Sequence, residues 1–102
     1  MKKIIDGKMY NTETAEKLDV YEADYPRNDF NWYVERLYQK KTKEFFLNSE
    51  GGPLSPYSKH AFGGGWTSGE YIKPLTIEEA KEWAQNRLNG DEYEEIFGSV
   101  EE

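Results

Sequence analysis

The feature that most constrains the fold of this chain is its supply of large apolar side chains, which is mainly aromatic. The sequence has 102 residues but only 19 that are Leu, Ile, Val or Phe, close to the level at which a strongly charged chain stays disordered. It also has 5 Phe, 3 Trp and 8 Tyr, and each aromatic side chain can bury about 150–250 Å². We therefore expect a single domain over residues 1–102, with an aromatic core beneath a charged surface.

The local patterns predict an α+β fold, with an antiparallel sheet of about four or five strands and two C-terminal helices packed on one face. Asp6-Gly7 is typical of a tight hairpin turn. Alternation of apolar and polar residues is strongest over 30–39 and weaker over 19–25. The expected strands are 2–5, 8–11, 19–25, 30–39, 44–48 and 70–73, with a hairpin tip at 40–43, a short helix at 12–18, and Pro74 closing the last strand.

The C-terminal region carries the clearest helix signals. Thr76-Ile77-Glu78-Glu79 matches a capping box, in which the Thr76 and Glu79 side chains satisfy each other's backbone N–H groups. An apolar stripe follows, and Asn89-Gly90 is expected to end this helix as a left-handed cap. A second, shorter helix is predicted from Asp91 to Phe97. The two stripes consist of Ile77, Ala80, Trp83, Ala84 and Leu88, then Tyr93, Ile96 and Phe97.

Residues 49–69 interrupt these patterns with six Gly, two Pro and four Ser. An irregular loop of this length is uncommon in a compact domain and is often functional. We expect the loop to let Trp66 fold back onto the sheet. In the alternative interpretation Tyr57, Phe62 and Trp66 stay partly exposed and anchor a partner.

The composition argues against most enzyme classes and against cofactor or metal sites. The chain has no Cys and a single histidine, His60, and its Ser residues lack the spacing of a nucleophile elbow. Gly63-Gly64-Gly65 lacks the Lys-Ser/Thr continuation of a phosphate-binding loop. The sequence contains no apolar run of 18 residues and no secretory signal at its start. We therefore expect a non-enzymatic protein that stays in the cytoplasm, without membrane contact.

Charge is unevenly distributed along the chain. The first 74 residues sum to zero, so residues 75–102 hold the whole net charge of −7. Non-specific binding to DNA is not expected, because it depends on Lys and Arg. The predicted partner-binding residues are the helix acids and two loop aromatics, although acidic helices also simply keep small proteins soluble. They are Glu78, Glu79, Glu82, Asp91, Glu92, Glu94, Glu95, Tyr57 and Trp66.

A basic cluster near the 40–43 tip offers a second hypothesis. Arg36, Lys40, Lys41 and Lys43 lie near Tyr33, Tyr38 and Phe45 in the sequence. Cations interleaved with aromatic rings can hold RNA through phosphate pairing and base stacking. Cations at a hairpin tip also commonly protect a sheet edge from aggregation. Both interpretations of these four residues stay open at this point.

Four segments together resemble a family of small acidic proteins of bacterial mobile elements and phages, some of which are anti-CRISPR proteins. The segments are residues 3–15, 37–47, 50–53 and 75–84, and their sequences are KIIDGKMYNTETA, LYQKKTKEFFL, EGGP and LTIEEAKEWA. The resemblance implies an inhibitor that acts in a bacterial host, binds a type II CRISPR effector nuclease with or without its guide RNA, and blocks guide RNA or target DNA binding. It transfers no individual site residue. The alternative function is a protein–protein adaptor or antitoxin-like module of a mobile element.

Overall fold

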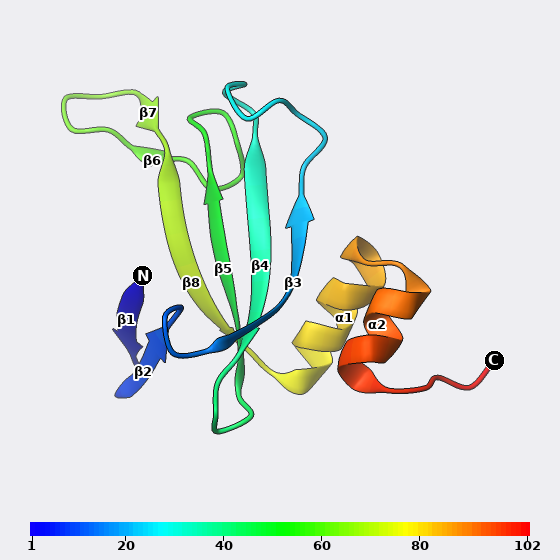
Figure 1. The fold of residues 1–102 in the computed structure, drawn as a ribbon. Coiled ribbons are helices and arrows are strands. Elements are labelled where there is room, and N and C mark those ends of the chain that lie inside the picture. Colours follow the sequence, from blue (N-terminus) through cyan, green and yellow to red (C-terminus); the bar gives the residue numbers. More distant parts are fainter.

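The main sheet is antiparallel, and its strands are joined in the order in which they occur in the chain (Figure 1). The structure is a computed structural model that describes all residues from 1 to 102. The strand order of the main sheet is β3-β4-β5-β8, so each strand lies beside the next main-sheet strand in the chain. The four strands are β3 (Glu16–Glu22), β4 (Tyr33–Gln39), β5 (Phe45–Gly51) and β8 (Gly69–Leu75). Two helices follow, α1 (Ile77–Arg87) and α2 (Gly90–Phe97), and they pack against the sheet.

Two small hairpins form separate two-stranded sheets. The first joins β1 (Lys2–Ile5) to β2 (Lys8–Asn11), and the second joins β6 (Lys59–His60) to β7 (Trp66–Thr67). In Figure 1 the β6–β7 hairpin projects from the end of the sheet that lies away from the helices. The chain therefore presents helices and a projecting hairpin at opposite ends of a body whose longest dimension is 50 Å.

The core is divided between the two faces of the sheet. Leu37 pairs with Leu47 across β4 and β5, and these side chains pack with Phe45 and Ala80 under the helices. Since successive strand residues face opposite sides, the next pair, Tyr38 and Phe46, lies on the other face. There the two rings stack with centroids 5.1 Å apart, and Tyr10 of the first hairpin packs edge-on against Phe46. The N-terminal hairpin thus covers part of the face that the helices leave free.

The predicted fold class is confirmed, as are the first hairpin and the capping box of α1. The predicted helix at 12–18 is wrong, because residues 12–15 form a turn and β3 begins at Glu16. The strand predicted at 30–39 begins only at Tyr33, and the 44–48 strand continues to Gly51. The last strand starts at Gly69 and includes Pro74, which an edge strand tolerates.

Two further predictions in the second half are corrected. The 49–69 segment is not a continuous loop, since its ends belong to β5 and β8 and its middle forms the β6–β7 hairpin. Asn89-Gly90 does not supply a left-handed cap for α1. Instead Leu88 ends α1 in an extended conformation, and Asn89 is the N-cap of α2, with Glu92 completing a second capping box. The residue with positive φ at the end of α2 is Gly98.

Candidate functional site

The seven predicted helix acids divide into two groups according to what their carboxylates contact. Glu79 accepts a hydrogen bond from the Thr76 backbone N–H at 2.9 Å, and Glu92 accepts one from the Asn89 N–H at 2.9 Å. These two carboxylates therefore stabilise the helix starts. The backbone bond lowers the pKa of Glu79 below its usual value. The carboxylates of the other five acids make no hydrogen bond or ion pair within the chain, and these acids are Glu78, Glu82, Asp91, Glu94 and Glu95.

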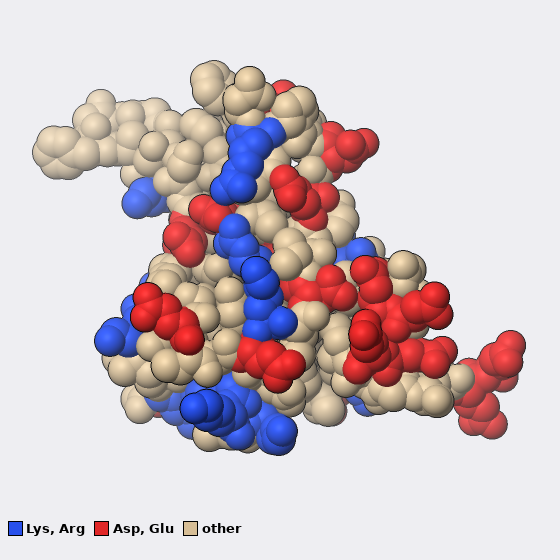
Figure 2. Space-filling view, viewed as in Figure 1, with Lys and Arg blue, Asp and Glu red and all other residues tan.

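We refer to these five exposed acids as the acidic surface. The buried residues of α1 are Ala80 and Ala84, so Glu78 and Glu82, one turn apart, lie on its outer side. In Figure 2 red side chains gather over the helices and the C-terminal tail, while blue ones form a band down the sheet and a cluster at its lower end. The acids of the C-terminal segment are therefore also grouped in space, whereas acids and bases are interspersed over the sheet.

A buried carboxylate that the sequence did not single out links α1 to the sheet. Glu35 of β4 is only 4% exposed, and it lies on the helix-facing side of the sheet with Leu37. It accepts hydrogen bonds from Trp83 Nε1 and Arg87 Nε, both at 2.9 Å, and from the Tyr57 hydroxyl. We call Glu35, Tyr57, Trp83 and Arg87 the Glu35 cluster. Every buried side-chain polar atom of the chain has a partner, so the Glu35 cluster is a satisfied network.

The ionisation of the Glu35 cluster follows from this arrangement. Burial raises the pKa of Tyr57 to about 12, and its hydrogen bond to Glu35 acts in the same direction. The hydrogen bond to Glu35 also raises the pKa of Arg87 above its ordinary value. Tyr57 is therefore a neutral donor and Arg87 a cation at neutral pH. Alternation along β4 places Glu35 among apolar neighbours, which is the one sequence signal that could have found it.

A groove of about 690 Å³ runs beside the Glu35 cluster, between α1 and β8. Tyr57, Tyr71 and Trp83 contribute aromatic walls, and Glu79 and Glu82 stand on its helical rim. The Tyr57 and Tyr71 ring centroids are 6.5 Å apart. Of the two predicted loop aromatics, Tyr57 is therefore a half-buried wall of this groove, and its hydroxyl and ring both contact neighbouring side chains.

Trp66 lies elsewhere and is 54% exposed, so the expectation that it folds back onto the sheet is wrong. Its ring stacks on His60 within the β6–β7 hairpin, with centroids 4.0 Å apart. Phe62 at the tip of this hairpin is fully exposed. The exposure of Trp66 and Phe62 and the half-buried state of Tyr57 match the alternative interpretation, in which these rings stay partly exposed. That they anchor a partner stays a prediction.

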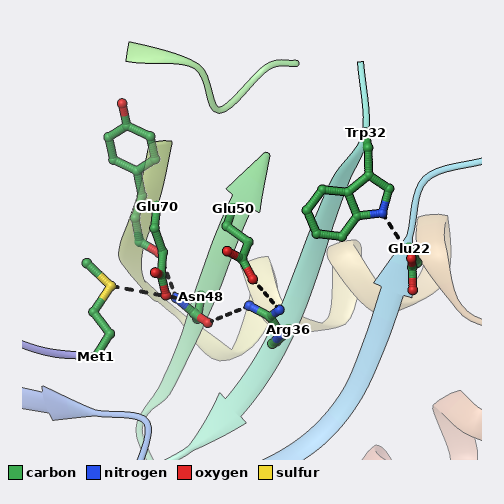
Figure 3. A network of polar contacts seen from close by, with 8 residues as sticks. Met1, Glu22, Trp32, Arg36, Asn48, Glu50 and Glu70 are labelled. Atoms are coloured by element: carbon green, nitrogen blue, oxygen red, sulfur yellow. Dashed lines mark hydrogen bonds and ion pairs between the residues drawn. The ribbon is translucent and has the colours of Figure 1, made fainter. Parts of the chain in front are cut away.

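The four predicted basic residues do not form one cluster. Arg36 lies on the sheet face opposite the helices, where it donates to Asn48 at 3.0 Å and pairs with Glu50 (Figure 3). Asn48 in turn donates to Glu70 at 3.0 Å, and beside this network Trp32 donates to Glu22 at 2.9 Å. The positive charge of Arg36 is therefore compensated by neighbours on its own face of the sheet.

At the hairpin tip, Lys40 is also compensated. Its ammonium group lies 4.3 Å from the centroid of the Tyr10 ring and 3.3 Å from Glu44, which Lys8 also contacts at 2.9 Å. Hydrogen bonds from Lys8, Thr42 and Lys40 lower the pKa of Glu44 to about 2. Lys41 and Lys43 are exposed and make no ion pair. Only these two of the four predicted basic residues remain free at this tip to contact a phosphate.

The chain contains no group of three side chains placed to hold a metal ion, and no helix with the length and apolarity needed to cross a membrane. Comparison of the chain with protein-family models, curated proteins and solved structures finds no match. The resemblance to small acidic mobile-element proteins therefore stays a prediction.

Proposed function

We propose that this chain is a non-enzymatic inhibitor that binds a type II CRISPR effector nuclease through its acidic surface and blocks guide RNA or target DNA binding. The observation that carries the proposal is the state of the five carboxylates of the acidic surface. They are exposed on two adjoining helices, and no cation of the chain neutralises them. Their negative charge is therefore available to an outside partner.

Nucleases of this class hold the guide–target duplex in a positively charged channel and contact its backbone rather than its sequence. Helix carboxylates can occupy such a channel in place of phosphates, since both present oxygen acceptors to Lys and Arg. The grouping of acids over the helices in Figure 2 favours one orientation of approach, with the helices leading. Long-range attraction then speeds association, as in other charge-steered complexes.

The test reverses Glu82, Glu94 and Glu95 to Lys. These three acids lie outside the first helical turns and cap nothing, so their reversal spares both the helix dipole and the capping boxes. We expect the helices to fold, the association rate with purified nuclease to fall, and binding to weaken about tenfold or more at low salt. The difference from the parent should shrink as salt is added, because screening shortens the range of attraction.

The matched control reverses Glu13, Glu16 and Asp24, three exposed acids outside the helices that make no ion pair. It changes the net charge by the same amount as the helix variant. Equal inhibition of target cleavage by the two variants would contradict the proposal. Loss of inhibition only in Lys41→Glu with Lys43→Glu would instead assign the contact to the basic hairpin tip and guide RNA.

A further inference from the structure

The β6–β7 hairpin with its tip, residues 58–68, forms an arm that makes no strand pairing with the main sheet. The Phe62 side chain at its tip is fully exposed and contributes nothing to the core. Trp66, behind it, is 54% exposed. Exposed aromatic side chains of this size are enriched at the centres of protein interfaces, where a few of them supply most of the binding energy.

The base of the arm is held firmly. The Tyr57 hydroxyl donates to Glu35, and the Tyr71 hydroxyl donates to the Ser58 carbonyl at 3.3 Å. Gly69 allows the chain to pass close to this base, because a Cβ there would lie 2.2 Å from the Tyr57 carbonyl oxygen. The arm therefore leaves the body of the protein in a defined direction, which Figure 1 shows to be away from the helices.

The tip is ordered by its own contacts. Ala61 N–H donates to the Gly65 carbonyl at 3.0 Å, and Gly64 N–H donates to the Ala61 carbonyl at 3.1 Å. The Trp66 ring stacks on His60 behind the tip. The tip glycines at 63, 64 and 65 all have positive φ, a conformation that residues with a Cβ rarely adopt. These contacts restrict the backbone of the arm before a partner encloses it.

The charge of the arm identifies the chemistry of its partner. Residues 51–69 contain no acid and only one base, Lys59, in a chain that has 20 acids. Affinity for nucleic acid rises with the number of phosphates that Lys and Arg neutralise, so one lysine supplies little of it. In contrast, an uncharged aromatic tip enters an apolar protein cleft without the cost of desolvating a charge. A protein cleft is therefore the better match.

We propose that the arm inserts Phe62 into an uncharged, apolar cleft of the partner protein, with the Trp66–His60 stack supporting it. This inference rests on the proposed function, because the partner is taken to be the same nuclease. It adds a second contact of different chemistry, at the end of the 50 Å molecule opposite the acidic surface. Binding through the arm should depend weakly on salt, whereas binding through the acidic surface depends on it strongly.

The test compares Phe62→Ala with Phe30→Ala in binding to purified, guide-free nuclease at low and high salt. Phe30 is 65% exposed in another loop, so Phe30→Ala also removes an exposed aromatic ring and serves as the matched control. We expect Phe62→Ala to melt like the parent and to bind about 10–100-fold more weakly at both salt concentrations. Phe30→Ala should melt and bind like the parent.

Other outcomes separate this inference from the proposed function. If Phe62→Ala binds as tightly as the parent while reversal of the acidic surface weakens binding, the arm inference is overturned and the proposed function stands. If the parent chain does not bind the nuclease, both are overturned. If Phe62→Ala weakens binding only when guide RNA is present, and Lys59→Ala weakens it equally, the arm contacts RNA, which also overturns the inference.

Discussion

Replacing Glu35 by Gln removes one charge from the helix-facing side of the sheet while almost preserving the volume of the side chain. The parent carboxylate has two acceptor oxygens for its three donors, Tyr57, Trp83 and Arg87. The Gln side chain offers one carbonyl oxygen, and its amide group is a donor that would face another donor. At least one hydrogen bond of the Glu35 cluster is therefore lost and the others lose their charge assistance.

A hydrogen bond to a charged group contributes about 1.5–3 kcal/mol to stability, and a buried donor without an acceptor costs about 1–3 kcal/mol. The Arg87 side chain is 36% exposed, so it can turn towards water and reduce the loss. We expect Glu35→Gln to lower the free energy of unfolding by about 3 kcal/mol, which corresponds to a decrease in Tm of about 12–24 °C. Such a decrease is a large part of the stability of a small domain.

Urea unfolding followed by circular dichroism measures this change, with Glu82→Gln as the control. Glu82 is exposed on the same helix and has no partner, so its variant should unfold like the parent. A double-mutant cycle with Arg87→Gln should give a coupling energy of about 0.5–3 kcal/mol. If Glu35→Gln unfolds at the same urea concentration as Glu82→Gln, the Glu35 cluster does not stabilise the contact between α1 and the sheet.

Three further substitutions or conditions test other parts of the structure. Trp83→Ala should cost about 3–5 kcal/mol. Trp83→Phe should cost about 2 kcal/mol, because Phe keeps most of the packing but loses the bond to Glu35, and equal unfolding midpoints for the two variants would contradict this. The folded-state pKa of Tyr57 is raised to about 12, so the neutral Tyr57 hydroxyl should stabilise the fold fully below pH 10, and this stabilisation should be lost as the pH rises from 10 to 12. Tyr57→Phe should weaken that pH dependence of the free energy of unfolding, which urea unfolding at several pH values measures. Asn89→Ala should lower the free energy of unfolding by about 1 kcal/mol because it removes the N-cap of α2, while Asn89→Asp should leave it nearly unchanged. Equal Tm values for these two variants in thermal melts would show that the Asn89 side chain does not stabilise α2.

The parts of the fold that the sequence predicted correctly depend on interactions between residues close in the chain. Thr76 and Glu79 satisfy each other within one helical turn, and Asp6-Gly7 reverses the chain by its own backbone preferences, with φ positive at both residues. The helix predicted at 12–18 failed because a helix this short is unstable alone. Pairing of β3 with β4 then decided the conformation from Glu16 onward, with a register shift between Lys17 and Asp19.

The candidate site was only partly predictable for a similar reason. The helix acids could be identified from composition, and their exposure follows from the apolar stripe of each helix. The Glu35 cluster could not be assembled, because its donors lie 22, 48 and 52 positions from Glu35 along the chain. Asn89 was assigned to the wrong helix because Asn before Gly suits the end of one helix as well as the start of the next.

The arm also affects the kinetics with which the sheet can form. Neighbouring strands of the main sheet follow one another in the chain, with no other main-sheet strand between them. Their pairing therefore closes only the loops that connect them directly, and folds with such local contacts form rapidly. The longest connection, residues 52–68 between β5 and β8, contains the arm. When the arm closes on itself before β8 joins β5, it roughly halves the length of free chain that this pairing must close, which lowers the entropy cost of that step by about 0.6 kcal/mol. In that order of events, the segment that is proposed to meet the partner also shortens the search for the last strand pairing.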